Sequence, residues 1–163
     1  MTDGFNAEEW GIGMKLLTVS MVIALIGLQT VAAASDPWTD ADLIQPKQLA
    51  ERIADKNAKQ PTILYVGFGV LYRSRHVAGA KFAGPCSKPE GLELLKRAVA
   101  SLSHDDEIVI YCGCCPLVRC PNIRPAFRAL REMGFHNVKV VPMPTNFHDD
   151  WDAKGYPTDS VNR

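Results

Sequence analysis

Four of the five cysteines lie within nine residues, in the segment Cys112-Gly-Cys-Cys-Pro-Leu-Val-Arg-Cys120. The segment follows an apolar run typical of a strand and precedes a pattern typical of a helix. A thiol at such a place lies near the free backbone amides of a helix start, which stabilise a thiolate or bind an anion. Because only the thiolate form of cysteine is a nucleophile, this segment is the candidate site for covalent chemistry.

Cys112 is the first residue after the strand-like run 107–111. Ligands of open α/β sheets bind beyond the carboxyl ends of the strands, so we expect this thiol to face a crevice and to act as the nucleophile. The alternative is a buried apolar cysteine at the end of a strand. Positive charge and loop amides would lower the pKa of the thiol and hold an anionic substrate. The substrate-binding residues expected on this basis are Arg119, Arg124, Gly113, Cys114 and Cys115.

The other cysteines of the loop suggest redox or metal chemistry. Cys114 and Cys115 are adjacent, so a disulfide between them would be strained. Cys120 can reach back across the loop, either as a resolving thiol for a persulfide or to form a regulatory disulfide. Four soft ligands could also bind zinc or copper(I), but the two spaced pairs of an ordinary zinc site are missing. We therefore assign no metal and no organic cofactor, and we interpret Cys86 as a packed side chain.

The elements that must position the loop follow from hydrophobic periodicity. Helices are expected over 46–56 and 123–133, with Gly134 ending the second, and a capping box at 87–90 opens a third. Strands are expected over 62–66, 107–111 and 138–141. Asn122 is expected to cap the helix after the loop. The alternation of strands and helices predicts an α/β fold, with a parallel or mostly parallel sheet covered on both faces.

The N-terminal segment has the pattern of a secretory signal peptide. Met14-Lys15 precedes the apolar run 16–28 and the small residues 32–34, so we expect cleavage before Ser35 and a periplasmic or extracellular protein. Acidic residues before Met14 do not suit such a signal, and a start at Met14 is an alternative. An uncleaved membrane anchor over 16–34 is another. The expected organisation is a signal region over 1–34, a polar lead-in over 35–42, a folded domain over 43–158 and a tail over 159–163.

Composition limits the partners. The 163 residues are 47% hydrophobic and contain 18 basic and 18 acidic side chains, which suits one globular domain with no net charge. No global field favours a nucleic acid or an anionic membrane, so we expect neither as a partner except through an uncleaved signal segment.

Three motifs resemble those of the rhodanese family. Tyr111-Cys112, a short loop and a helix ending at Gly134-Phe135 resemble the active-site segment of rhodanese domains. The segment His76-Val-Ala-Gly-Ala80 resembles the family's His-x-x-Gly-Ala turn, and the segment Trp151-Asp-Ala-Lys-Gly-Tyr-Pro157 resembles its Trp…Gly-Tyr-Pro ending. Their order and spacing agree over about 43–158.

The resemblance implies a central parallel sheet of five strands with helices on both faces. It implies a sulfurtransferase in which Cys112 takes a sulfane sulfur from a donor such as thiosulfate. The resulting persulfide would pass the sulfur to a thiol or a cyanide-like acceptor, and a protein thiol is a further candidate acceptor.

Two departures leave alternatives open. The stretch from Cys112 to Pro121 is longer than an ordinary rhodanese loop, and Val66-Gly67-Phe68 stands where family members often have Asp-x-Arg. Loop size and anion ligands set what fits a site. Phosphatases and arsenate reductases of the same fold have an enlarged loop ending in arginine, although their usual spacing is one residue shorter than Cys112…Arg119. The other alternative is a noncatalytic cysteine cluster that binds a metal or acts in redox chemistry.

Overall fold

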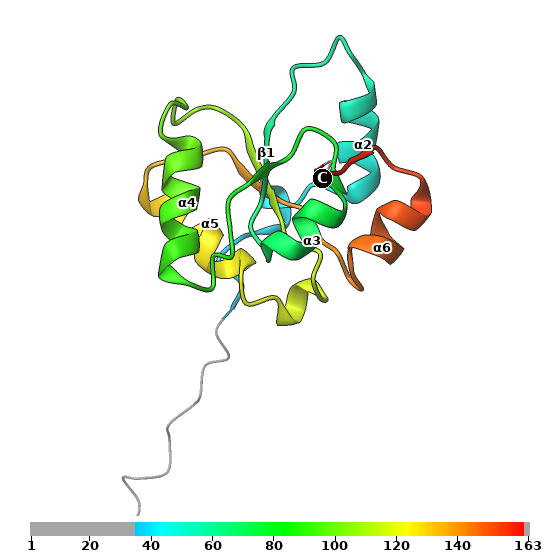
Figure 1. The fold of residues 1–163 in the computed structure, drawn as a ribbon. Coiled ribbons are helices and arrows are strands. Elements are labelled where there is room, and N and C mark those ends of the chain that lie inside the picture. The colour runs from blue at the N-terminus through cyan, green and yellow to red at the C-terminus, as the bar shows by residue number, and fades with distance from the viewer. Residues whose placement is uncertain (1–34, 162–163) are drawn as a thin grey trace, which may run out of the picture. The chain divides into compact units, whose positions relative to one another are not determined.

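A parallel sheet with the strand order β3-β1-β4-β5 organises residues 35–161, the part of the chain that this computed structural model describes (Figure 1). The four strands are β1 (Thr62–Tyr65), β3 (Lys81–Phe82), β4 (Ile108–Tyr111) and β5 (Val138–Val140). The signal region expected over 1–34 lies outside the described residues. Within residues 35–161, no helix has the length and apolar character needed to cross a membrane.

The fifth strand implied by the resemblance is reduced to a single bridge. Leu43 forms one parallel bridge with Val140, and the Ile44 N–H donates to the Val140 carbonyl at 3.0 Å. A short 3-10 helix, η1 (Asp40–Asp42), ends just before this point, and Pro46 begins α2 (Pro46–Ala54) just after it. Because no further residues are free to extend the ladder, the expectation of five strands is wrong and the sheet has four.

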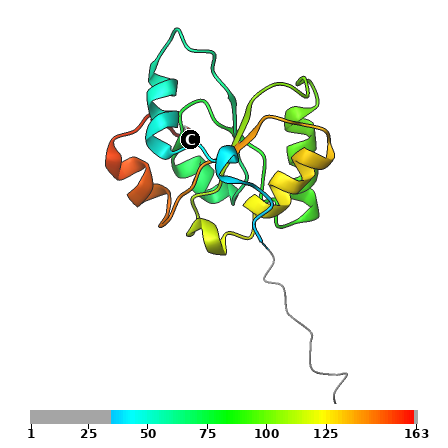
Figure 2. The ribbon, with the colours of Figure 1, turned by 180° about the vertical axis from the view of Figure 1, so that it is seen from behind.

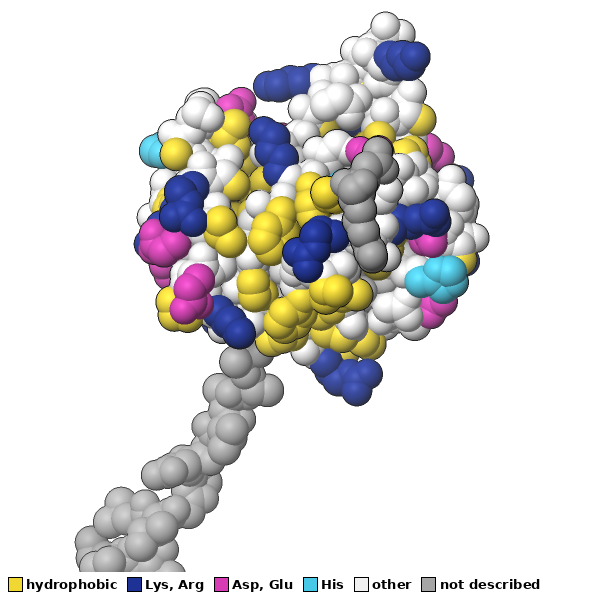
Figure 3. All heavy atoms as spheres, in the orientation of Figure 1, with side chains coloured by type: hydrophobic (Ala, Val, Ile, Leu, Met, Phe, Trp, Pro, Cys, Tyr) yellow, Lys and Arg dark blue, Asp and Glu magenta, His cyan; other side chains and the backbone are white. Residues whose placement is uncertain are grey.

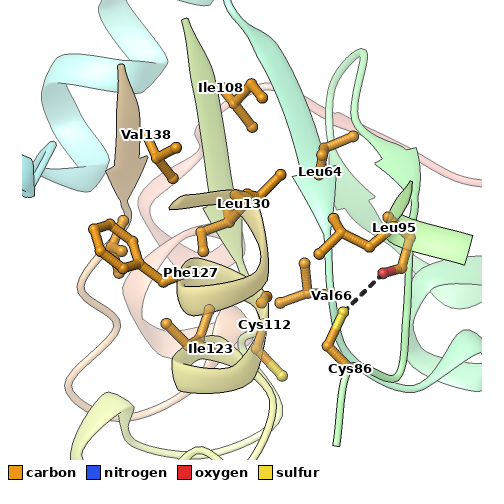
Figure 4. Packing of buried hydrophobic residues seen from close by; sticks show 14 of the residues in the cluster. Leu64, Val66, Cys86, Leu95, Ile108, Cys112, Ile123, Phe127, Leu130 and Val138 are labelled. Atoms are coloured by element: carbon orange, nitrogen blue, oxygen red, sulfur yellow. Dashed lines mark hydrogen bonds between the residues drawn. The ribbon is translucent and has the colours of Figure 1, made fainter. Parts of the chain in front are cut away.

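Helices cover both faces of the sheet, as the alternation of elements predicts. One face packs against α4 (Pro89–Val99) and α5 (Ile123–Glu132), which lie together in both views (Figures 1 and 2). Figure 4 shows this core, where Leu64 and Ile108 from the strands meet Leu130 from α5. The other face packs against α2, α3 (Gly69–Ser74) and α6 (Phe147–Asp150). Strand residues alternate between the two cores because successive side chains of a strand point to opposite faces.

Two helix starts differ in detail from the sequence expectations. Helix α4 is capped at Lys88 without a side-chain hydrogen bond, so the capping box expected at 87–90 is wrong. Pro89 occupies the first turn and sets the start one residue later, which leaves the Ser87 N–H free to donate to Asn122 Oδ1. Asn122 does stand at the N-cap of α5, but its side chain makes no capping bond. Its amide instead hydrogen-bonds to Ser87 and to Cys112, which lie far apart in the sequence.

A second, two-stranded antiparallel sheet closes the C-terminal end of the domain. Strand β2 (His76–Val77) pairs with β6 (Thr158–Asp159), so that His76 faces Asp159. The buried His76 ring hydrogen-bonds through Nδ1 to the Tyr72 carbonyl at 2.7 Å, which ties β2 to α3. The short 3-10 helices η2 (Leu117–Arg119) and η3 (Asp152–Lys154) complete the structure.

Candidate active site

A cavity of about 670 Å³ opens where the carboxyl ends of β1 and β4 lie side by side. The chain runs from β1 to β3 on one side of β1, and then to β4 and β5 on the other side of β1. The topological switch point of the sheet therefore lies between β1 and β4. Ligands of open α/β sheets bind at such a point. Tyr65 ends β1 and Cys112 directly follows β4, and both line the cavity. The full lining is Tyr65, Leu71, Ser74, Arg75, Cys112, Gly113, Cys114, Asn146, Phe147, His148 and Asp152.

Charged side chains on one wall of the cavity form a small network. The Arg75 guanidinium lies 2.6 Å from one carboxylate oxygen of Asp152, and His148 Nδ1 lies 3.3 Å from the other. The hydrogen bond from Arg75 holds the pKa of Asp152 below its usual value. The Arg75 side chain is still 55% exposed, so its guanidinium can also meet a ligand. Apolar side chains gather on the face that carries α3 (Figure 3), where Val70 and Leu71 are exposed.

Cys112 lies at the floor of the cavity and is only 3% exposed. Figure 4 shows it at the edge of the core, near Ile123 and Val66. Its Sγ lies 3.1 Å from Cys114 Sγ, and Asn122 Nδ2 donates to it at 3.5 Å. The pKa of Cys112 is raised, chiefly because its S–H group is hydrogen-bonded to Cys114 and then to Cys120. The raised pKa favours the protonated form of Cys112, in contrast to the lowered pKa expected from the sequence.

The two cysteines with thiolate character are Cys114 and Cys120, whose thiols lie close to that of Cys112. The hydrogen bond from Cys112 lowers the pKa of the half-buried Cys114 to about 6. The same thiol lowers the pKa of Cys120 to about 7, with further help from the backbone N–H groups of Asn122 and Ile123. Those amides at the start of α5 were expected to act on Cys112, but they reach Cys120 instead. Burial raises the pKa of Cys115 to about 12.

The loop brings its cysteines together. The Sγ atoms of Cys112, Cys114 and Cys120 all lie within 4.8 Å of one another, and Cys115 Sγ lies 3.3 Å from Cys114 Sγ. All of these cysteines are free thiols. The fold therefore places Cys120, the resolving thiol expected from the sequence, within reach of both Cys112 and Cys114.

The two arginines expected to bind substrate lie elsewhere. Arg119 stands on the exposed helix η2 and is not among the described residues that line the cavity. Arg124 forms an ion pair with Asp36 and lies over the Trp38 ring, with 5.5 Å between its guanidinium carbon and the ring centroid. It also donates to the Cys120 carbonyl at 3.4 Å. Arg124 thus stabilises the cysteine loop through the loop backbone and not from within the cavity. Of the other residues expected to bind substrate, Gly113 and Cys114 line the cavity and Cys115 does not.

Solved structures share this architecture. The rhodanese-like domain of the Alr3790 protein from Anabaena sp. is 24% identical, with a TM-score of 0.56, and the match covers 74% of this chain and 80% of that one. The fold of the present chain is rhodanese-like. The BH2092 protein from Bacillus halodurans is 14% identical, with a TM-score of 0.57, and the match covers 90% of this chain and 87% of that one.

The rhodanese-like domain also matches one part of a larger enzyme. Thiosulfate sulfurtransferase from Pseudomonas aeruginosa is 23% identical to it, with a TM-score of 0.55, over 77% of this chain. The match spans only 20% of the length of that enzyme. No protein-family profile and no curated protein matches the sequence. The fold expected from the three motifs is confirmed.

Sequence reasoning did not identify Tyr65 as a residue of the site. Its ring is buried, and within residues 35–161 its hydroxyl is the one buried side-chain nitrogen or oxygen without a hydrogen-bond partner. Burial raises the pKa of Tyr65, so the hydroxyl stays protonated and can donate a hydrogen bond to a ligand in the cavity. In the sequence Tyr65 was marked only as part of the strand expected over 62–66.

Asn122 and Arg75 are two further residues that contribute to the rhodanese-like site and that sequence reasoning did not assign to it. The buried Asn122 side chain accepts from the Ser87 N–H through Oδ1 and donates to Cys112 through Nδ2. It therefore fixes the nucleophile candidate relative to the segment before α4. In the sequence, Arg73 and Arg75 lie in one basic stretch that suits either an anion-attracting rim or a solvated surface, and nothing there distinguishes the two arginines.

Proposed function

We propose that this rhodanese-like domain is a sulfurtransferase that carries a sulfane sulfur as a persulfide on Cys112. The donor is a small anion such as thiosulfate, and the acceptor is a thiol, of a small molecule or a protein, or a cyanide-like nucleophile. The observation that carries the proposal is the position of Cys112 Sγ on the floor of the cavity, 3.1 Å from a thiol with a lowered pKa. A buried thiol that rests protonated needs a nearby base in order to attack, and Cys114 is that base.

The first half-reaction loads the sulfur. The Cys112 proton moves to the Cys114 thiolate while Cys112 Sγ attacks the outer sulfur of thiosulfate. A new S–S bond forms, the S–S bond of the donor breaks, and sulfite leaves with the bonding electron pair. Cys112 supplies the electron pair of the new bond and the transferred sulfur keeps its oxidation state, so no separate oxidant or reductant takes part.

The second half-reaction unloads it. An acceptor thiolate attacks the outer sulfur of the persulfide, the bond to Cys112 breaks, and Cys112 leaves with the electron pair. The proton held on Cys114 then returns to Cys112. The acceptor becomes a persulfide, and cyanide in the same role becomes thiocyanate.

Two groups in the cavity suit an anionic donor. The exposed part of Arg75 supplies positive charge on one wall. The Tyr65 hydroxyl supplies a buried donor beside Cys112. Hydrogen bonds to charged oxygens are stronger inside a cavity than in water, so both groups favour bound thiosulfate and the departing sulfite.

Intact-mass measurement after incubation with thiosulfate tests the proposal. We expect the reduced wild type to gain one sulfur atom and Cys112→Ser to gain none. Cys114→Ser should still load, but more slowly, because it has lost the base. Loading of Cys112→Ser would show that another cysteine is the nucleophile, and failure of the wild type to load would remove the sulfurtransferase proposal.

We also propose that the domain is exported, on the strength of the signal pattern over 1–34. Expression of the full chain in a bacterium that secretes through signal peptides tests this. The mature protein should be found outside the cytoplasm with Ser35 at its N-terminus. Recovery of an uncut chain in the cytoplasm would contradict it.

A further inference from the structure

A second, very small void lies next to the main cavity, on the inner side of the cysteine loop. Its volume is about 10 Å³, roughly the space taken by a single water-sized sphere. Three cysteines and a methionine are among its lining residues, and the rest are apolar or glycine. The lining is Cys112, Gly113, Cys115, Leu117, Cys120, Ile123, Val141 and Met143.

Two of the cysteines that line the void, Cys112 and Cys120, also belong to a cluster of three thiols. The thiols of Cys112, Cys114 and Cys120 lie within 4.8 Å of one another, although Cys120 is eight residues further along the chain than Cys112. The Met143 thioether comes from the segment after β5 and lies 3.1 Å from where a Cβ on Gly113 would be. No carboxylate or imidazole is among the described residues that line the void. A site with only sulfur ligands is suited to a soft ion.

We propose that Cys112, Cys114 and Cys120 bind a single copper(I) ion. Thiolates and thioethers select copper(I) and zinc among the biological metals. Structural zinc is nearly always tetrahedral with four ligands, whereas copper(I) is satisfied by three thiolates. Three thiols are mutually close here, and Cys115 lies outside that set, although its thiol is 3.3 Å from Cys114 Sγ and also interacts with Cys120.

The surroundings suit a buried cluster of thiolates around a cation. Cys112 and Cys120 are 3% and 2% exposed, so an ion between them would be shielded from water and from oxidation. Asn122 Nδ2 donates to Cys112, and the backbone N–H groups of Asn122 and Ile123 face Cys120. Such outer hydrogen bonds orient metal ligands and offset the negative charge of thiolates.

Copper binding and sulfur transfer would exclude each other, a consequence that rests on the function proposed above. Cys112 Sγ cannot hold a sulfane sulfur and a copper ion at the same time. Bound copper(I) should therefore prevent loading from thiosulfate. The two proposals can still fail separately, because copper retention is measured without any sulfur donor.

Anaerobic titration of the reduced full chain with copper(I), against a chromophoric copper(I) chelator, tests the site. We expect the wild type to retain one copper per chain after desalting. Cys112→Ser, Cys114→Ser and Cys120→Ser should each bind at least about tenfold more weakly, since each removes one ligand. Cys86→Ala is the matched control, because Cys86 is a buried thiol that bonds to the Ala83 carbonyl outside the cluster, and it should retain one copper.

Several results would overturn the copper site. Equal copper retention by the wild type and the three serine variants would show adventitious binding. Retention of zinc in preference to copper(I), from a mixture of the two, would refute the choice of metal. X-ray absorption of the copper-loaded protein should show three sulfur neighbours, and a spectrum dominated by nitrogen or oxygen would contradict the assignment. Sulfur loading of metal-free protein, measured on a separate sample, tests the function alone.

Discussion

The hydroxyl of Tyr65, the last residue of β1, and the thiol of Cys112, the residue after β4, share one small space. A Cβ atom added to Gly67 would lie 2.7 Å from both Cys112 Sγ and Tyr65 Oη, closer than real Cβ contacts come. Glycine at this position therefore lets the nucleophile candidate and the buried donor approach the same point. In the proposed reaction that point is where the sulfane sulfur and the oxygens of its donor would meet.

Gly67→Ala should disturb the site more than the fold. The added methyl group displaces the Tyr65 ring or the Cys112 side chain, at a cost of roughly 1–3 kcal/mol for overpacking. We expect sulfur loading from thiosulfate, followed by intact mass, to slow by at least about tenfold, a loss that corresponds to about 1.4 kcal/mol in the transition state. Gly69→Ala is the control, because it stands at the first residue of α3, where its neighbours are the flexible tips of Arg73 and Phe82. Equal loading by the two variants would contradict the shared space.

The lowered pKa of Cys114 predicts a characteristic pH profile. Its thiolate is the reactive form, so alkylation by iodoacetamide should rise with pH and reach half its limit near pH 6. The hydrogen bond from Cys112 is the largest cause, and Cys112→Ala removes it, so the midpoint in that variant should move up toward the ordinary value of 9.0. Peptide mass mapping of the modified cysteine provides the measurement. A wild-type midpoint already near 9.0 would show that Cys114 is not the base.

Arg75 should determine how well an anionic donor binds. Arg75→Gln removes the guanidinium and leaves the Asp152 carboxylate with only the His148 ring beside it, so the cavity wall becomes less favourable to thiosulfate. We expect KM for thiosulfate to rise by about tenfold or more, with a smaller change in kcat, as for a lost charged hydrogen bond. Arg73→Gln, in the last turn of α3 and outside the cavity lining, should leave KM unchanged. Equal effects would indicate a general charge effect of α3.

Asn122 offers a way to separate folding from chemistry. Asn122→Asp keeps the acceptor for the Ser87 N–H but replaces the donor to Cys112 with a negative charge, which disfavours a Cys112 thiolate. Asn122→Ala removes both bonds from a buried position and should lower the free energy of unfolding by about 1–3 kcal/mol. Because a carboxylate buried without a cation is costly as well, we expect both variants to be less stable than the wild type in urea, and Asn122→Asp to load sulfur at least as slowly as Asn122→Ala. Faster loading by Asn122→Asp would show that the amide has only a structural role.

The elements around the loop could be predicted because their signals are local. The apolar run 107–111 and the helical spacing after Asn122 specify β4 and α5 without help from the rest of the chain. Gly134, with φ at +88°, ends the helix region as a glycine at that position indicates. The cysteine loop therefore had to lie at the carboxyl end of a strand, and it does.

The residues that complete the site could not be predicted because their positions depend on tertiary contacts. Tyr65 and Arg75 reach the cavity only after β1 pairs with β4 and α3 folds over the sheet. The Asn122 side chain had a local capping role available, and a distant partner at Ser87 replaced it. The expectation of a fifth strand was wrong for a similar reason, since the start of α2 at Pro46 limits the pairing with β5 to one bridge. Competing partners, rather than weak propensities, account for these differences.

The pairing of β2 with β6 makes one side of the pocket depend on a contact between segments far apart in the chain. The four strands of the main sheet lie between Thr62 and Val140, so that sheet does not need the later segment. The segment that follows Arg75 has its antiparallel partner in Thr158 and Asp159. Local opening of this short pairing can therefore loosen one side of the pocket while the cysteine loop stays in place.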